Sequence, residues 1–206
     1  MSAGMYVLGG GGHAKVAVAT LQSMGEIVSA IFDDDAAKIG QQLLDINIEC
    51  ATPSSGWWRE KGRRAFIAIG NNAIRAELSA LDAKWVVAKH TDSAVHASVE
   101  VGDGTLICAG VVIQPDTTLG QHTIANTSCS IDHDCKVGDF AHVGPGAVLA
   151  GGVHVGASAF IGAGATIMPG VCVGSGAVVG AGAVVTRNVG EGQTVVGVPA
   201  KELRHE

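Results

Sequence analysis

Two carboxylates flank one imidazole in the segment Asp132-His133-Asp134, the densest cluster of reactive side chains in the sequence. A carboxylate beside an imidazole stabilises the protonated ring and raises its pKa, as a general base requires. Ile131 and Cys135, on either side, have the character of interior residues, so the triplet is expected to point outwards. A lone outward histidine would fit a solvated polar corner. The flanking acids favour a catalytic base, His133, supported by Asp134.

A six-residue repeat surrounds this cluster and runs from residue 95 to residue 189. Its first position is Val, Ile or Leu in fifteen of sixteen units, with Ala125 as the exception, and its fifth position is always a small side chain. Such a repeat is typical of a parallel β-helix, in which each unit buries its apolar face only by stacking on its neighbours. A β-sandwich of short strands is disfavoured, because the spacing of its strands varies.

Three units close one triangular coil, so residues eighteen apart lie one above the other at about 4.8 Å. Gly151 follows His133 by eighteen residues, and its N–H is expected beside the ring, where it can stabilise an oxyanion. Ala163 and Ala181 are also eighteen apart and share a second column, along which an extended ligand can bond to the backbone. Asn126 adjoins the one break in the aliphatic row and is a candidate substrate contact.

The first ninety residues have a different pattern, in which a short apolar run leads into four glycines at residues 9–12 and then into a helical pattern. Gly9, Gly11 and Ala14 satisfy the dinucleotide-loop pattern G-x-G-x-x-A. Asp33 lies about twenty residues further on, where an acid that binds ribose is expected. Backbone N–H groups of the glycines would approach a diphosphate at the N-terminus of the helix. A structural turn without a ligand is the alternative.

A third strand is expected at residues 65–69 and ends at Gly70, and ligands of such sheets bind at the strand ends. Residues 85–90 are expected to form the last strand of this unit. The unit is half the size of a full dinucleotide fold, which disfavours a dehydrogenase. The sequence therefore predicts an α/β plus all-β chain: a small Rossmann-like nucleotide-binding domain (1–90) followed by a parallel β-helix with a C-terminal tail (91–206).

Composition agrees with this organisation and narrows the partners. Glycine makes up 30 of 206 residues and aromatic residues only 4%, as a narrow coil requires. A net charge of −6 disfavours nucleic acid or an anionic membrane as a partner. The five cysteines form no C-x-x-C motif and no signal peptide is visible, so we expect a reduced, cytoplasmic chain.

The repeats, together with DHDC, GDFAHVGPGAVLAGG and GVPAK, resemble the left-handed β-helix acyltransferases. With GGGGHAK, FDDD and FIAIGNNAIRAEL added, the chain is similar to bacterial sugar acetyltransferases that carry an N-terminal nucleotide-sugar-binding domain. This subgroup includes PglD-type UDP-4-amino-sugar N-acetyltransferases, GDP-perosamine (PerB-type) N-acetyltransferases and NeuD-type sialic acid O-acetyltransferases. The resemblance implies left-handed coiling, a homotrimer, and acetyl-CoA as cosubstrate in the groove between neighbouring coils, with no metal.

The resemblance also implies roles for individual residues. His133 matches the catalytic base and Asp134 its supporting carboxylate. His142 and the Gly151 amide match contacts to the acetyl thioester, and Ala163 and Ala181 match contacts to the pantetheine arm. The positions that match nucleotide-sugar contacts are Gly11, Gly12, His13, Asp33, Asp34 and Gly70.

The expected function is acetyl transfer from acetyl-CoA to the 4-amino group of a nucleotide-linked 4-amino-(di)deoxy sugar in bacterial glycan biosynthesis. The nucleotide stays open between UDP, dTDP and GDP. Sialic acid O-acetylation is the runner-up. A γ-type carbonic anhydrase is a remote alternative, because His122, His133 and His142 are eleven and nine residues apart and do not match the zinc ligands of that family. A non-enzymatic scaffold is also remote.

Overall fold

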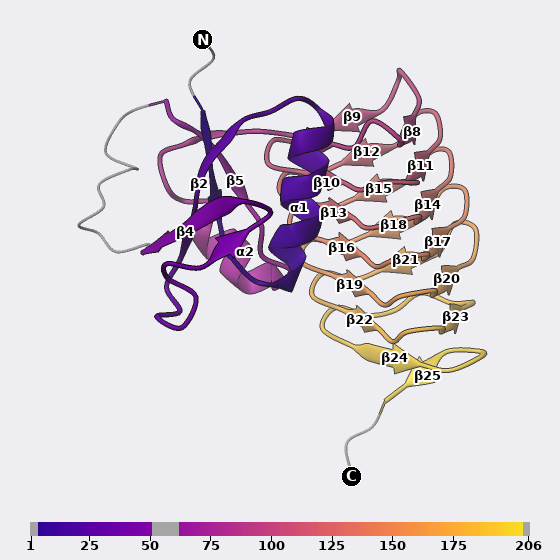
Figure 1. The fold of residues 1–206 in the computed structure, drawn as a ribbon. Coiled ribbons are helices and arrows are strands. Elements are labelled where there is room, and N and C mark those ends of the chain that lie inside the picture. Colours follow the sequence, from indigo (N-terminus) through magenta and orange to yellow (C-terminus); the bar gives the residue numbers. More distant parts are fainter. Residues whose placement is uncertain (1–3, 51–61, 204–206) are drawn as a thin grey trace.

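The computed structural model describes residues 4–50 and 62–203 and places them in two parts that lie side by side (Figure 1). An α/β part extends to Trp85, and a β-solenoid begins at Ala88. The solenoid is a left-handed parallel β-helix, so the predicted fold class is confirmed. Within the described ranges, no helix has the length and apolar character needed to cross a membrane.

The α/β part is a sheet with strand order β3-β4-β2-β1-β5-β6, in which only β3 and β4 pair antiparallel. Helix α1 forms because Ala14, Ala17, Val18 and Leu21 recur at helical spacing, and all four are buried. The elements are β1 (Met5–Leu8), α1 (Gly12–Ser23), β2 (Val28–Asp33), β3 (Gln42–Leu43), β4 (Ile46–Cys50), β5 (Arg64–Ile67), α2 (Asn72–Leu78) and β6 (Lys84–Trp85).

The solenoid has three faces, which the chain visits in turn. The first face holds β7 (Ala88–Lys89), β10 (Leu106–Ile107), β13 (Ile124–Ala125), β16 (His142–Val143), β19 (Phe160–Ile161), β22 (Val178–Val179), β24 (Thr194–Val196) and the antiparallel β25 (Lys201–Glu202). The second face holds β8 (Ala94–Val95), β11 (Val112–Ile113), β14 (Ser130–Ile131), β17 (Val148–Leu149), β20 (Thr166–Ile167) and β23 (Val184–Val185). The third face holds β9 (Glu100–Val101), β12 (Thr118–Leu119), β15 (Lys136–Val137), β18 (His154–Val155) and β21 (Cys172–Val173).

The strand pairing has the predicted eighteen-residue spacing, as in Ile131 with Leu149 and Val137 with Val155. The aliphatic residues fill the interior, and small residues such as Ala141 and Ala159 are fully buried beside them. The glycine that follows an aliphatic residue is required by stacking. A Cβ at Gly138 or Gly156 would lie within 2.6 Å of the backbone of the next rung.

The expected strand at residues 85–90 is wrong as a single element. Lys84 and Trp85 pair with β5 in the α/β sheet, whereas Ala88 and Lys89 pair with β10 and form the first rung of the solenoid. The chain therefore passes from one part to the other within this short segment. The domain boundary after residue 90 stays a proposal.

The α/β part packs on the first face of the solenoid and on the edge between its third and first faces. Helix α1 contacts β7, and the Ser23 hydroxyl accepts a hydrogen bond from the Thr91 N–H. The Trp85 ring meets the His122 ring edge-on, with 5.1 Å between centroids. This packing decides which face of the coil the glycine loop of the α/β part can reach.

Candidate active site

His133 and Asp134 lie on the edge between the second and third faces, in the turn that joins β14 to β15. Asp134 Oδ2 is 2.7 Å from His133 Nδ1, and both side chains are more than half exposed, at 66% and 60%. The hydrogen bond to Asp134, helped by the charge of Asp132, raises the pKa of His133. Since Asp134 holds Nδ1, the Nε2 atom is left for a substrate proton. The predicted acid-supported imidazole is thus formed within one turn.

Gly151 lies one rung beyond His133 on the same edge, and the ring packs directly against it. A Cβ on Gly151 would come within 2.7 Å of both Nε2 and Cε1 of His133. The backbone does not need glycine here, because Gly151 lacks the left-handed φ of its neighbour Gly152 (+68°). Among the described residues, no acceptor takes the Gly151 N–H. A free amide donor therefore lies beside the imidazole, as the eighteen-residue spacing predicted.

Ala163 and Ala181 lie on a different edge, between the first and second faces. They are neighbours in a column, since the Gly182 N–H donates to the Ala163 carbonyl at 2.8 Å. Within the described part of the chain, neither alanine N–H has an acceptor. The second face separates them from His133 and Gly151. The two predicted sets of acetyl-CoA contacts consequently do not meet within one protomer.

His142 lies on the first face beneath the α/β part, away from the edge that carries His133. It is 8% exposed, and burial lowers its pKa to about 4. Asn126 Nδ2 lies 3.0 Å from His142 Nε2 and donates to it, while the Asn126 Oδ1 accepts the Thr127 N–H. This arrangement places the proton of the neutral ring on Nδ1. Asn126 and His142, predicted on separate grounds, thus form one pair.

His13 completes this cluster from the other side of the seam between the two parts. Its ring centroid is 6.1 Å from that of His142, and burial, followed by the charge of Arg75, lowers its pKa. His13 Nε2 and His142 Nδ1 are buried without a hydrogen-bond partner among the described residues. Two neutral imidazoles therefore face the junction between the glycine loop and the coil. Their proximity could not be inferred from sequence, because it depends on how the two parts dock.

The glycine loop has the free donors that an anion requires. Gly11 is the N-cap of α1 and has no side-chain cap, and a Cβ on Gly11 or Gly12 would meet nothing within 4 Å. Gly70 lies three residues beyond the end of the neighbouring strand β5 and faces the His13 ring, where a Cβ would lie 3.9 Å from Cγ. Gly11, Gly12, His13 and Gly70 thus gather where β1 and β5 end, the usual ligand position in such a sheet.

Asp33 is turned towards its own loop. Its carboxylate accepts the Gly10 N–H at 2.6 Å and the Asp35 N–H at 2.9 Å, and it pairs with Lys38 at 3.1 Å. Burial alone would raise the pKa of Asp33, but these hydrogen bonds and the Lys38 charge together lower it. Asp33 therefore shapes the glycine loop. Asp34, the next predicted contact, is exposed.

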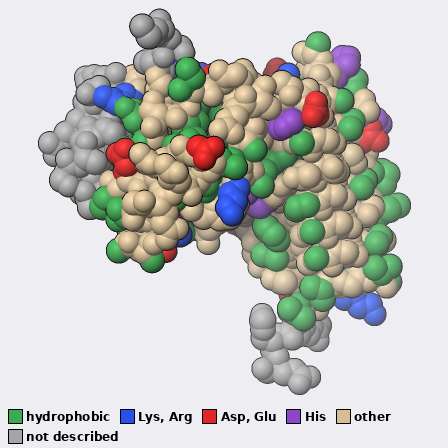
Figure 2. Space-filling view, in the orientation of Figure 1, with side chains coloured by type: hydrophobic (Ala, Val, Ile, Leu, Met, Phe, Trp, Pro, Cys, Tyr) green, Lys and Arg blue, Asp and Glu red, His purple; other side chains and the backbone are tan. Residues whose placement is uncertain are grey.

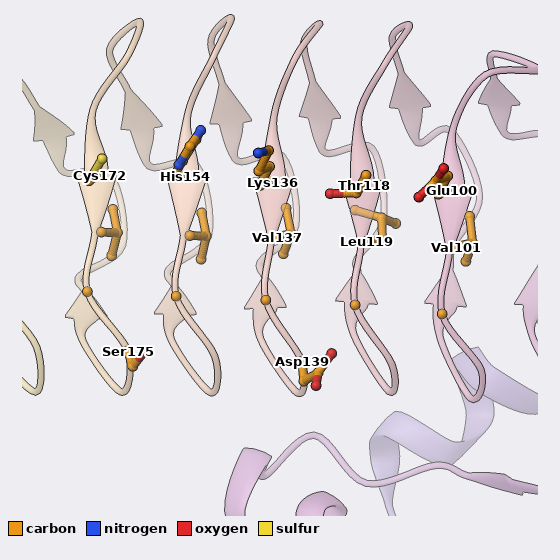
Figure 3. A pocket seen from close by; sticks show the side chains of 17 residues that line it. Glu100, Val101, Thr118, Leu119, Lys136, Val137, Asp139, His154, Cys172 and Ser175 are labelled. Carbon is orange, nitrogen blue, oxygen red and sulfur yellow. The ribbon is translucent and has the colours of Figure 1, made fainter.

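A groove of about 780 Å³ runs along the third face, where Glu100, Thr118, Lys136, His154 and Cys172 form a row on successive strands (Figure 3). None of the predicted site residues lines it. The row follows directly from the eighteen-residue register. The candidate site residues of the solenoid lie instead on its edges and on its first face.

Comparisons with known proteins agree with the two-part architecture. Residues 5–80 match the PglD N-terminal domain, residues 92–115 the hexapeptide repeat of succinyl-transferase, and residues 152–187 the bacterial transferase hexapeptide. The crystal structure of PerB from Caulobacter crescentus, in complex with CoA and GDP-perosamine, is 40% identical over 99% of each chain, with a TM-score of 0.92. The chain belongs to the PglD-type hexapeptide sugar acetyltransferases.

Two further relatives extend this family assignment. The acetyltransferase domain of PglB from Neisseria gonorrhoeae, in complex with acetyl coenzyme A, is 34% identical over 97% of this chain and 98% of that one, with a TM-score of 0.88. GDP-perosamine N-acetyltransferase of Escherichia coli O157:H7 is 32% identical over 89 residues, a match that spans 41% of this chain and 40% of that relative. The predicted family and enzyme class are confirmed.

Sequence reasoning missed one residue of this acetyltransferase that links its two parts. Arg75 is 1% exposed and forms hydrogen bonds with the coil as well as with its own domain. The sequence does place an arginine three residues after Asn72 on an expected short helix. This helix follows the strand whose end was expected to border the ligand. That pattern marks one helix face but does not show what the face contacts.

Proposed function

We propose that the protein transfers an acetyl group from acetyl-CoA to the 4-amino group of a nucleotide-linked 4-amino-(di)deoxy sugar in bacterial glycan biosynthesis. The observation that carries this is the pair formed by His133, held by Asp134, and the free Gly151 N–H beside its ring. A base and an oxyanion donor at adjacent positions suit attack on a thioester. The CoA and GDP-perosamine bound by PerB of Caulobacter crescentus support both substrates.

His133 acts as the base. Its Nδ1–H donates to Asp134, so the Nε2 lone pair accepts the proton of the amine as the amine nitrogen bonds to the acetyl carbon. The Gly151 N–H stabilises the resulting oxyanion. The carbon–sulfur bond then breaks, the proton passes from His133 to the leaving sulfur, and amide and thiol are the products. His133 returns to its neutral form, so one side chain serves both proton transfers.

Gly11, Gly12 and His13 hold the nucleotide diphosphate through N–H groups at the start of α1, and Gly70 borders the same space. Helix N-termini with free amides bind phosphate in this way. Asp33 maintains the loop through the Gly10 N–H, and the exposed Asp34 is left to contact the nucleoside. The α/β domain thereby sets the position of the sugar.

A homotrimer is part of the proposal, because one protomer cannot assemble these groups. In a three-sided prism, the His133 edge lies opposite the first face, on which the protomer's own α/β part packs. The second face carries an uncharged outward column, consisting of Ala94, Val112, Ser130, Val148, Thr166 and Val184. Figure 2 shows separate hydrophobic side chains among backbone and other side chains along the visible side of the solenoid.

If three second faces surround a threefold axis, the edge with His133 and Gly151 of one protomer adjoins the edge with Ala163 and Ala181 of the next. The free N–H groups of the two alanines then donate hydrogen bonds to the pantetheine arm in the groove between coils. The same contact brings His133 towards the neighbour's first face, where Asn126 and His142 lie. Acetyl-CoA supplies the acetyl thioester in this groove. A cytoplasmic location, expected from the cysteines, belongs to the same proposal.

The direct test is release of CoA thiol with purified protein, acetyl-CoA and a panel of UDP-, dTDP- and GDP-linked 4-amino sugars. Turnover of at least one is expected. No turnover of any of them, with acetylation of a sialic acid instead, would replace the proposal by the runner-up.

The shared site has its own test. His133→Asn and Gly12→Trp are each expected to retain only a small residual activity, the second because it fills the nucleotide loop. Co-expressed and mixed within trimers, they should regain part of the wild-type rate, because an intact His133 then meets an intact loop of another protomer. Mixed trimers without activity would show that each protomer works alone.

A further inference from the structure

Helix α2 is bonded to the coil through two side chains on one face of its first turns. Arg75 Nε donates to the His122 carbonyl at 2.7 Å, and Arg75 Nη2 donates to the Phe140 carbonyl at 2.6 Å. Asn72 Nδ2 donates to the Ser158 carbonyl at 2.8 Å. His122, Phe140 and Ser158 are eighteen residues apart, so the helix contacts three successive rungs on the edge between the third and first faces.

The other side of the same guanidinium holds the ligand end of the α/β sheet. Arg75 Nη1 donates to the carbonyls of Ile69 at 3.0 Å and Gly70 at 3.3 Å, and Nη2 also donates to Asn72 Oδ1 at 2.9 Å. Burial lowers the pKa of Arg75 to about 10, so it remains charged at neutral pH. The buried guanidinium of Arg75 thus bonds to neutral oxygens of both domains and holds the two domains together.

The three carbonyls come from the turn position that has a left-handed φ at every sixth residue of the coil, from Gly104 to Gly182. His122, Phe140 and Ser158 have φ values of +50°, +59° and +56°, in the left-handed region where glycine is the common residue. The rings of His122 and Phe140 stack with 7° between their planes. Strained residues of this kind persist only where the surroundings hold them. The helix therefore docks on the regular turn backbone of the coil, at carbonyls that the neighbouring rungs hold in place.

We propose that Asn72 and Arg75 are positioning residues that fix the height of the α/β domain along the coil and so the height of the sugar it binds. The inference rests on the proposed function, since Gly70 borders the nucleotide-sugar space. Rungs are about 4.8 Å apart, and a misplacement of about 1 Å can lower a rate by about a hundredfold. A shift of the helix along the coil by part of a rung would break the carbonyl contacts on all three rungs.

The test compares Arg75→Gln and Asn72→Ala with Arg64→Gln. Arg64 is the matched control, because it pairs with Glu26 at 2.8 Å within the α/β domain. Both docking variants should lose about tenfold or more in kcat. Their Kd for the nucleoside diphosphate and KM for acetyl-CoA should stay within about twofold of wild type. Arg75→Lys should recover part of the rate, and Arg64→Gln should match wild type.

Hydrogen exchange separates this inference from the proposed function. In Arg75→Gln, residues 69–78 and the turns at 120–123 and 138–141 should exchange faster than in wild type or Arg64→Gln, whether or not any sugar is acetylated. Unchanged exchange, kcat within twofold of wild type, or nucleotide affinity lost in step with kcat would each overturn the positioning role. If Arg75→Gln does not fold, Asn72→Ala decides by the same measurements.

Discussion

Replacing Gly151 with alanine should displace the ring of His133, the proposed base, while leaving the fold and the amide donor in place. The new Cβ would lie 2.7 Å from Nε2 and Cε1 of His133, and ordinary contact begins near 3.4 Å, so the ring must move by about 0.7 Å. A displacement of that size is expected to lower kcat by roughly ten- to a hundredfold. Alanine at 151 keeps its N–H, so the loss reports on the ring rather than on the oxyanion contact.

The same turn position elsewhere in the coil shows that a side chain is tolerated there. Ala157, Ala163, Ser175 and Ala181 occupy it on other turns. The position recurs sixteen times, at every sixth residue from 97 to 187, and only residue 151, which lies against His133, is glycine. Gly151→Ala should therefore leave the melting temperature and the proposed trimer nearly unchanged. A loss of rate in this variant would therefore come from the displaced His133 ring and not from unfolding.

The assay is a double-mutant cycle with thiol release as the readout. Gly151→Ala is measured in the wild-type and in the His133→Ala background. The substitution should cost activity only where the ring is present, so its effect in the second background should be within about twofold. Full kcat in the single variant, or an equal loss in both backgrounds, would refute the geometry.

Three other substitutions test the base, the loop and the core. Asp134→Asn removes the hydrogen bond that raises the pKa of His133; the base then deprotonates at lower pH, so the acid limb of the kcat/KM profile should shift to lower pH while kcat falls roughly tenfold. Asp33→Asn should cost about 1–3 kcal/mol at pH 7. The pKa of Asp33 in the folded protein is below its ordinary value of 3.8. The difference in unfolding free energy between wild type and Asp33→Asn is therefore present above pH 3.8 and should shrink as the pH falls further. Thermal melts at several pH values measure this difference. Leu149→Ala, fully buried in the coil, should cost about 2–5 kcal/mol in denaturant unfolding.

The coil was predictable because its geometry repeats. Once three units make a rung, the neighbour of every residue follows by counting eighteen, and Gly151 could be placed beside His133 in this way. The outward direction of His133 followed from the interior character of Ile131 and Cys135, which are both fully buried. Local patterning was thus enough to predict both the strand register and the exposed turn that carries His133.

The contacts between the two parts were not predictable, since no repeat relates them. Arg75 lies 47 residues from His122 and 65 from Phe140, yet bonds to both. His13 and His142 approach each other for the same reason. Asp33 was expected to face a ribose, but Lys38 and the Gly10 N–H already engage its carboxylate, a local arrangement that the sequence pattern does not reveal.

In the proposed mechanism, the residues that carry out the reaction and the residues that select the substrate belong to different parts of the protein. The proposed base and oxyanion donor belong to the solenoid and depend only on its rung spacing. The loop proposed to bind the nucleotide sugar belongs to the α/β domain, and in our proposal Asn72 and Arg75 set the height of that domain on the coil through backbone carbonyls. Because carbonyls are present whatever the side chains, that joint can be kept while the loop and Asp34 change. Substrate preference should therefore vary within the α/β domain without any change at His133, Asp134 or Gly151.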